Sequence, residues 1–251
     1  MGVMGKIVGG TIGFALGGPL GAIAGAAFGH VFDKSDVEYV EYRKDPMSAG
    51  ESSQFTFYVA AFSMLAKLAK ADGRVDPSEL DAVRRFMAKD LNLDPFGRKI
   101  AEDIFSAALN SNDRFEDFAN QFYREFRSQP QLLELMADIL FKVASADGTL
   151  NETESRMIRT AMTLFHLDET VHQGLLRKYG GLNDKAYAVL KSIRTDSDDQ
   201  IKTNYRKLVG DYHPDKIASK GLPDEFNKFA HDKFIEIQNA YEEIKKERGM
   251  A

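Results

Sequence analysis

The sequence predicts an all-α protein on three observations. Apolar residues recur at helical spacing between Phe55 and Tyr179, and no convincing alternating strand interrupts them. Two segments within this stretch match each other, and the C-terminal part reads as two long amphipathic helices joined by a loop. The predicted parts are a transmembrane anchor at 1–30, a tether at 31–54, an all-α domain at 55–178, a linker at 179–183 and a C-terminal domain at 184–251.

Composition restricts the classes of partner. The chain has 251 residues and a formal net charge of −5, so it has no general attraction for nucleic acid or anionic lipid. We therefore expect no nucleic-acid partner, and any basic docking surface must be local. The chain contains no cysteine, which excludes disulfides, thiolate zinc sites and thiol catalysis.

The uncharged stretch from Ile7 to Gly29 predicts a transmembrane helix. It would be about 34 Å long, enough to cross a hydrocarbon core of about 30 Å. Glycine recurs at every fourth position, which would form a ridge where a second helix can approach closely. This glycine zipper predicts a homodimer through the transmembrane helix and consists of Gly9, Gly13, Gly17, Gly21, Gly25 and Gly29.

Two other interpretations of this stretch stay open. A cleaved signal peptide would use the weakly basic Lys6 and a cleavage site at 22–24. A peripheral glycine-rich hairpin would bend at Pro19.

Basic residues that flank the stretch predict its orientation. Only Lys6 precedes it, whereas Lys34, Arg43 and Lys44 follow it closely. By the positive-inside rule we expect a single-pass protein of the inner (cytoplasmic) membrane, with its C-terminal domains in the cytoplasm.

The middle domain contains an internal sequence repeat. Segments 64–87 and 137–162 each read as a helix closed by a glycine and followed by a second helix. Ala-Asp-Gly at 71–73 recurs at 146–148. The pattern predicts a bundle of about seven helices with a pseudo-twofold internal repeat. Further helix starts are predicted at Asp94-Pro95 and Gln129-Pro130.

Polar side chains in the two units allow two interpretations. They are Asp72, Asp76, Glu79, Asp147, Asn151 and Glu154. As capping boxes, Asp76 with Glu79 and Asn151 with Glu154 would satisfy free N–H groups at helix starts. As ion ligands they would be weak metal candidates, because their spacing does not fit an EF-hand loop. Capping explains most of them, and we expect no cofactor. The isolated His166 and His172 are expected to be structural or exposed.

The pattern Ala-Asp-Gly-x-[Val/Leu]-x-x-x-Glu, present in both units, resembles the TerB-like, tellurite-resistance-type helical domain. The resemblance covers roughly Phe55 to Lys178. It implies the fold of the middle domain more firmly than its function, because one fold hosts many functions.

Three helical segments are predicted after the linker. The first covers 184–192, and a capping box of Ser197 and Gln200 opens the second. The apolar stripe of the second helix comprises Ile201, Tyr205, Leu208 and Tyr212. The third helix begins at about Pro223, and its apolar side comprises Phe226, Ala230, Phe234, Ile237, Tyr241 and Ile244.

The second of these helices ends in Tyr-His-Pro-Asp-Lys. Proline disfavours helix at the residue before it, so we expect His213 in a turn. No nearby Ser or Cys offers a nucleophile, and an isolated His-Asp pair is poor acid–base machinery without a pocket that shifts its pKa values. A metal pair with His231 and Asp232 lacks ligand spacing. We therefore expect that the chain is not an enzyme.

The basic second helix, the His-Pro-Asp turn and the late Asn-Ala-Tyr resemble the J-domain of DnaJ-type co-chaperones, from Asp184 to Arg248. The resemblance implies a DnaK-type chaperone as partner. Its ATPase domain would offer an acidic surface to Lys202, Arg206 and Lys207. Its ATPase domain and interdomain linker would meet His213, Pro214 and Asp215, which would promote ATP hydrolysis.

The second helix has two features that bear on binding to a chaperone. The basic side of the second helix could alternatively be a simple solvated surface. Gly210-Asp211 stands where many J-domains carry further basic residues, which puts the strength of stimulation in doubt.

The three parts together resemble a family of membrane-anchored DnaJ-like proteins of Gram-negative bacteria. The first expectation is a co-chaperone that recruits a DnaK-type chaperone to membrane-proximal clients. The second is a membrane-localised stress or signalling adaptor whose TerB-like domain binds an ion or a protein partner. The chain contains no Gly/Phe-rich stretch after the J-domain and no cysteine-rich zinc module, so we expect it to lack the client-binding parts of a full DnaJ.

Overall fold

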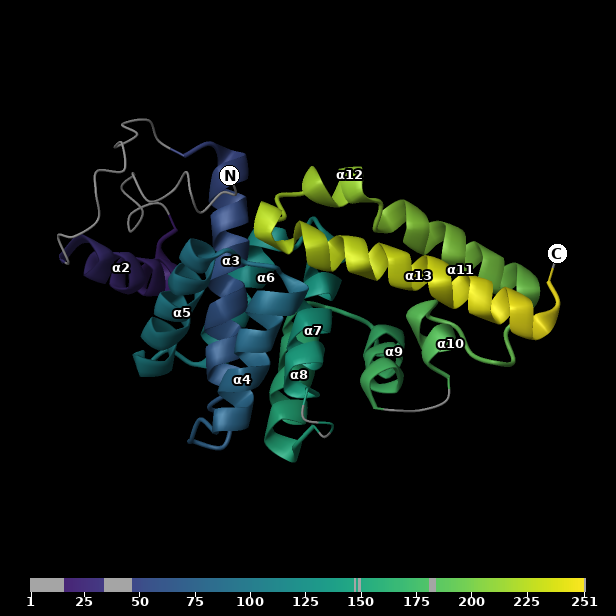
Figure 1. The fold of residues 1–251 in the computed structure, drawn as a ribbon, viewed down its shortest axis with the longest axis horizontal. Coiled ribbons are helices and arrows are strands. Elements are labelled where there is room, and N and C mark those ends of the chain that lie inside the picture. Colours follow the sequence, from purple (N-terminus) through teal and green to yellow (C-terminus); the bar gives the residue numbers. More distant parts are fainter. Residues whose placement is uncertain (1–15, 34–46, 147, 149, 181–183, 251) are drawn as a thin grey trace.

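The computed structural model describes residues 16–33, 47–146, 148, 150–180 and 184–250. Every regular element in these ranges is a helix, which confirms the all-α prediction (Figure 1). Three predicted site residues, Gly9, Gly13 and Asp147, lie outside the described ranges.

The middle domain is a helical bundle around α3 (Ala49–Leu68), which is buried along most of its length and packs against α5, α6 and α7. The other elements of the bundle are α4 (Pro77–Arg85), the short π-helix η2 (Phe86–Asp90), α5 (Pro95–Asn110), α6 (Phe115–Phe126), α7 (Pro130–Ala144), α8 (Glu152–Leu164) and α9 (Glu169–Tyr179). Prolines begin α5 and α7 as predicted, and Asp94 caps α5 by accepting a 2.7 Å hydrogen bond from Gly97 N.

Two helix pairs in this bundle, α3 with α4 and α7 with α8, share a local design. The second helix of each begins at a capping box, formed by Asp76 with Glu79 in α4 and by Asn151 with Glu154 in α8. The turn before each box contains a glycine in the left-handed region, Gly73 or Gly148. Both capping boxes are confirmed, and a pseudo-twofold axis that relates the pairs stays a prediction.

The structure corrects the predicted membrane helix at its described end. The sequence predicts one helix from Ile7 to Gly29, whereas α2 covers Gly18–Asp33. Gly17 and Gly18 have φ values of +55° and +58°, which interrupt a right-handed helix and which glycine adopts without a Cβ penalty. The glycine ridge therefore does not continue along one helix through Gly17. Among the described residues, no helix combines the length and apolarity needed to span a membrane.

Helix α2 packs its apolar side against α3, α5 and α6. The buried side chains on this side are Leu20, Ile23, Ala24, Ala27 and Phe28. Gln121 of α6 holds the start of the helix, because its Oε1 accepts from Leu20 N at 3.0 Å and its Nε2 donates to Gly17 O at 3.0 Å. The first N–H groups of a helix have no partner within the helix, and Gln121 supplies one from a distant segment.

The tether between α2 and α3 is shorter than the predicted 31–54. Ser48 Oγ accepts from Glu51 N at 3.2 Å, and Glu51 Oε2 accepts from Ser48 N at 3.0 Å. This capping box lets α3 begin at Ala49. The first helical turns are polar, which is why the apolar pattern alone placed the start too late.

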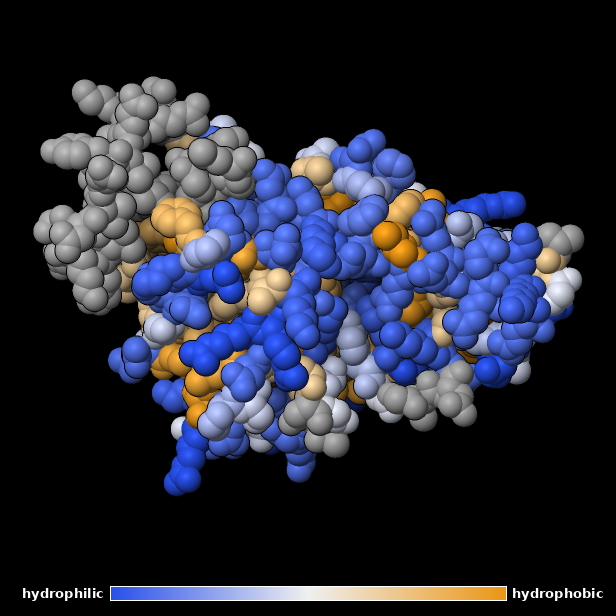
Figure 2. Space-filling model, in the orientation of Figure 1, coloured by the Kyte–Doolittle hydropathy of each residue, from blue (hydrophilic) through white to orange (hydrophobic). Residues whose placement is uncertain are grey.

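The C-terminal domain is a helical hairpin with short helices around it. Its elements are α10 (Lys185–Val189), α11 (Asp198–Asp211), α12 (Pro214–Ala218), the 3₁₀ turn η3 (Asp224–Phe226) and α13 (Asn227–Arg248). Helices α11 and α13 lie side by side and extend away from the bundle (Figure 1). The face shown in Figure 2 is mostly hydrophilic, with apolar residues in small patches.

Two local details of the hairpin differ from the prediction. Helix α13 begins at Asn227 rather than at about Pro223, because a 3₁₀ turn precedes it. The capping box of α11 is half formed. Ser197 Oγ accepts from Gln200 N at 3.2 Å, but the Gln200 amide donates to Asn204 at 2.9 Å instead of returning to the cap.

Candidate functional site: the His-Pro-Asp turn and its supports

The His-Pro-Asp motif follows the buried Tyr212 directly, with His213 in the turn between α11 and α12 and with Pro214 and Asp215 as the first residues of α12. His213 has φ −58° and ψ 131°, the extended backbone that a following proline favours, and the predicted turn is confirmed. Pro214 is the first residue of α12, where a backbone N–H is not needed. The His213 carbonyl accepts from Ile217 N at 3.0 Å, which closes the first turn of α12.

The imidazole of His213 folds back on the backbone that follows it. Its Nδ1 accepts a 3.3 Å hydrogen bond from Asp215 N, so the neutral ring carries its proton on Nε2. The Asp215 carboxylate lies 3.8 Å from the same nitrogen. The ring meets Phe234 of α13 edge-on, with centroids 5.9 Å apart. The three motif residues thus form one small, locally fixed unit.

This unit is open to a protein partner. The side chains of His213 and Asp215 are 49% and 93% exposed. Ile217 is buried beneath them and anchors α12 to the hairpin. Fixed, exposed polar groups on a short helix suit recognition by another protein, since little ordering is needed on binding.

Three basic side chains of α11 are predicted to act with the turn. Lys202 is half-buried, whereas Arg206 and Lys207 are exposed. Within the described part of the chain, none of the three forms a salt bridge with an acidic side chain. They therefore give this helix a local positive field, although the chain as a whole is acidic.

The unusual Gly210-Asp211 pair has a structural use. Asp211 Oδ1 accepts a 3.2 Å hydrogen bond from Gln131 Nε2 of α7, so the acidic residue contacts the middle domain. A Cβ at Gly210 would meet Lys216 Nζ at 3.9 Å, an ordinary contact, so a larger residue fits there.

The structure confirms that the predicted apolar side of α11 packs inside the hairpin. Ile201 and Leu208 are buried, and Tyr205 stacks on Tyr241 of α13 with centroids 4.0 Å apart. The side chain of Phe226 does not pack inside the hairpin, as the other residues of the stripe were predicted to do. It is completely buried in the middle domain, with its ring centroid 5.0 Å from that of Phe57.

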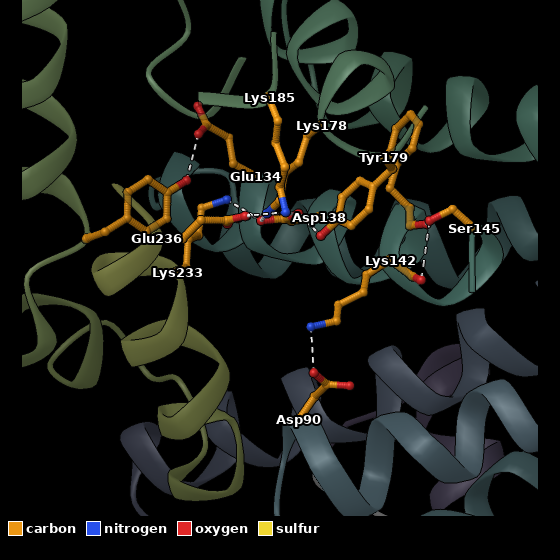
Figure 3. A network of polar contacts seen from close by, with 12 residues as sticks. Asp90, Glu134, Asp138, Lys142, Ser145, Lys178, Tyr179, Lys185, Lys233 and Glu236 are labelled. Carbon is orange, nitrogen blue, oxygen red and sulfur yellow. Dashed lines mark hydrogen bonds and ion pairs between the residues drawn. The ribbon is translucent and has the colours of Figure 1, made fainter. Parts of the chain in front are cut away.

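A buried polar network that sequence reasoning missed joins the two domains. Asp138 of α7 is completely buried and accepts hydrogen bonds from Lys178 at 3.0 Å, from the Tyr179 hydroxyl at 2.6 Å and from Lys233 of α13 (Figure 3). Burial alone would raise the pKa of the Asp138 carboxyl, but these partners hold the pKa well below its usual range. Its charged form is therefore stabilised at the centre of the contact.

The two lysines respond differently to the same carboxylate. Burial would lower the pKa of Lys178, but Asp138 and Glu236 outweigh it and the pKa is raised. Burial and the nearby Lys178 lower the pKa of Lys233 in spite of Asp138. Burial also raises the pKa of Tyr179 well above its usual value, and Asp138 adds to this effect. Both lysines form an ion pair with Asp138, and Lys178 also pairs with Glu236 at 2.8 Å.

One sequence signal could have revealed this contact. Helix α7 is mostly buried and apolar, yet four polar residues recur at helical spacing along it, namely Gln131, Glu134, Asp138 and Lys142. Such a stripe on an otherwise apolar helix indicates a polar contact with another element.

The weak metal candidates come together only in part. Asp72, Asp76, Glu79, Asn151 and Glu154 line one small cavity of about 130 Å³. The carboxylates of Glu79 and Glu154 accept hydrogen bonds as capping groups. In the described ranges, no group of three or more His, Asp or Glu side chains is arranged to hold a metal ion.

The two isolated histidines, His166 and His172, each pack against an aromatic side chain. His172 is buried, packs against Phe141 and lies 3.2 Å from Glu169 through its Nδ1. His166 adopts a positive φ of 53° beside the ring of Tyr123.

The hairpin with its exposed His-Pro-Asp turn defines a J-domain protein, here joined to a TerB-like bundle. Family models agree with this division. The DnaJ domain matches residues 185–249, the tellurite resistance protein TerB matches 58–175, and the co-chaperone DjlA transmembrane domain matches 1–53. No solved structure matches the chain.

Three curated relatives that resemble the whole chain or most of it are co-chaperones of the same name. The chain is 32% identical to the co-chaperone protein DjlA of Coxiella burnetii, over 100% of both chains. It is also 32% identical to DjlA of Haemophilus ducreyi, over 99% of both chains, and 28% identical to DjlA of Escherichia coli K12, over 88% of this chain and 89% of that one. The chain belongs to the DjlA family of co-chaperones.

Proposed function

We propose that this protein is a membrane-anchored co-chaperone that stimulates ATP hydrolysis by a DnaK-type chaperone. In this proposal the protein is not itself an enzyme, because the chaperone carries out the ATP hydrolysis. It recruits that partner to clients near the membrane.

The observation that carries the proposal is the exposed His213-Pro214-Asp215 unit at the end of a basic helix. The imidazole and the carboxylate are fixed next to each other by the first turn of α12. They are suited to contact the joint between the ATPase domain and the interdomain linker of the chaperone. A small rigid turn can couple to such a joint because its own conformation does not change on binding.

The basic side chains have a separate task in this mechanism. Lys202, Arg206 and Lys207 attract an acidic surface of the ATPase domain and orient the encounter. Exposed charges act mainly on the association rate, and salt screens them. The complex is therefore transient and weakens as ionic strength rises.

Membrane anchoring is supported by the family match at residues 1–53. A bilayer-inserted α2 would have to leave the groove of α3, α5 and α6, because its apolar side cannot face lipid and the bundle together. The positive-inside rule favours a single-pass anchor of the inner membrane with both folded domains in the cytoplasm. The anchor would dimerise through the glycines of α2 that remain helical, Gly21, Gly25 and Gly29.

Gln121 gives a direct test of this anchoring step. Gln121→Ala removes the cap that holds α2 to the bundle, so it should increase the carbonate-resistant membrane fraction of the full chain. Gln173→Ala, at an exposed glutamine of α9, is the matched control. A membrane fraction that does not differ between the two variants would contradict the exchange of α2 between bundle and bilayer.

The adaptor alternative finds less support. It requires an ion or partner site in the TerB-like domain, and the capping hydrogen bonds already engage Glu79 and Glu154.

The proposed function is tested by ATP hydrolysis of a DnaK-type chaperone with the full chain in lipid nanodiscs. Stimulation that disappears with His213→Gln supports it. A rate that is unchanged when the wild-type chain is added contradicts it.

A further inference from the structure

The loop that carries the His-Pro-Asp turn is held at both of its ends by the TerB-like domain. At the first end, the Tyr212 hydroxyl donates to Glu134 Oε2 at 2.7 Å. Lys191 Nζ donates to both oxygens of the same carboxylate at 2.8 Å. Tyr212 is buried, so its hydroxyl depends on this partner.

The second end of the loop is also buried. Leu222 and Phe226 are completely buried, and the Leu222 carbonyl accepts from Gln54 Nε2 of α3 at 3.1 Å. The Phe226 ring packs against aromatic rings of the bundle, with centroids 5.0 to 6.4 Å away, namely those of Phe57, Tyr58, Phe62 and Phe86. Such aromatic packing resists local opening.

One side chain bridges the two ends. Gln131 Nε2 donates to Asp211 Oδ1 at 3.2 Å, and Gln131 Oε1 accepts from Lys220 Nζ at 2.8 Å. Its partners carry opposite charges, so only this orientation of the amide satisfies both. Between them, His213 and Asp215 remain exposed, whereas Tyr212 and Ile217 are buried.

We propose that Gln131 and Glu134 of the TerB-like domain are positioning residues for the J-domain, holding both ends of the loop so that the His-Pro-Asp turn is presented to the chaperone in its binding conformation. The proposal rests on the proposed function for its effect on the chaperone. The restraint on the loop itself is independent of that function.

The restraint should affect the apparent affinity of the protein for the chaperone. If only a fraction of the molecules presents the turn in the binding conformation, the apparent dissociation constant rises as the inverse of that fraction. The plateau of ATPase stimulation stays the same, because the bound turn is the same. A residue that touched the chaperone chemistry directly would lower the plateau instead.

Gln131→Leu and Tyr212→Phe test the restraint from its two sides, in the full chain in nanodiscs. Gln131→Leu removes the bridge, and Tyr212→Phe removes one hydroxyl while keeping the ring. Gln173→Leu is the matched control, because it makes the same exchange at an exposed glutamine of the same domain. Thermal unfolding of each variant checks that the two domains remain folded.

The first readout is amide hydrogen exchange of residues 211–226 without any chaperone. We expect exchange to be several-fold faster in Gln131→Leu and Tyr212→Phe, and unchanged in Gln173→Leu. Unchanged exchange in both loop variants would overturn the proposal, whatever the ATPase does.

The second readout is ATPase stimulation as a function of co-chaperone concentration. We expect a several-fold higher half-saturating concentration for both loop variants, with the wild-type plateau. Faster exchange with an unchanged half-saturating concentration, or a lower plateau alone, would overturn the positioning role. No stimulation by the wild type would instead remove the proposed function and, with it, the positioning role, while the exchange result would still decide the restraint.

Discussion

The Tyr212 hydroxyl donates a 2.7 Å hydrogen bond to Glu134 of α7, so the residue directly before the His-Pro-Asp turn is tied to the TerB-like domain. The phenol is buried, and burial raises its pKa well above the usual value, with the Glu134 charge adding to the effect. The hydroxyl is therefore a permanent donor at physiological pH. The J-domain of this protein is built into a larger contact and is not an appendage on a free linker.

Removing that hydroxyl should destabilise the protein. Tyr212→Phe removes one hydrogen bond to the Glu134 carboxylate, which keeps Lys191 as its other donor, and hydrogen bonds to charged groups contribute about 1.5–3 kcal/mol. We expect the free energy of unfolding to fall by about that amount in chemical denaturation of the full chain. Tyr241→Phe, at a half-buried tyrosine of the same hairpin, should change it much less. Equal effects of the two substitutions would show that the hydrogen bond contributes nothing.

The ionic network around Asp138 should be a larger contributor. Asp138→Asn removes the anionic partner of the buried Lys233 and leaves Lys178 with Glu236 alone, and breaking a buried pair in this way costs about 3–5 kcal/mol. The control Asp232→Asn removes an exposed pair with Lys228, whose loss costs about 0–1 kcal/mol. Denaturation midpoints of both variants measure the contrast. A small effect at Asp138 would mean that the network is not formed in solution.

The same network predicts an acid-sensitive contact. The pKa of Asp138 is lower in the folded protein than the value of about 3.9 expected in the unfolded chain. Its contribution is therefore fully present above about pH 4 and is lost as the pH falls below that value. The difference in unfolding free energy between the wild type and Asp138→Asn should shrink as the pH falls from about 4. A difference that stays constant would contradict the assigned charge.

The basic face of α11 should control the salt dependence of chaperone binding. Alanine at Lys202, Arg206 or Lys207 removes a basic side chain that forms no salt bridge within the described residues, and should weaken binding by up to about fivefold each, since exposed ionic contacts contribute about 0.2–1 kcal/mol. The loss should appear mainly in the association rate and should fade at high salt. Lys246→Ala, at an exposed lysine near the end of α13, should leave binding unchanged. A loss that is independent of salt would point to a packing role for these side chains.

Local sequence signals predicted much of this molecule for physical reasons. Prolines, capping boxes and apolar spacing act within a few residues, so the starts of α5, α7 and α8 could be read directly. The His-Pro-Asp turn is equally local, because proline sets its own backbone and that of the preceding residue.

Contacts between distant segments could not be read in this way. The pattern placed Phe226 on the apolar side of a hairpin helix, but it did not show that its ring enters the core of another domain. Likewise, the glycine period suggested one straight helix, whereas Gly17 and Gly18 take left-handed conformations next to Gln121. A partner that is distant in sequence decides each of these cases, and periodicity carries no information about it.

Single-turnover ATP hydrolysis by a DnaK-type chaperone tests the central claim most directly. The full chain in nanodiscs is compared with His213→Gln, a substitution at a half-exposed turn residue that should change the unfolding free energy by no more than about 0.5 kcal/mol. The account predicts that the wild type accelerates the turnover and that the equally stable variant does not. Equal acceleration by both, or none by the wild type, would contradict it.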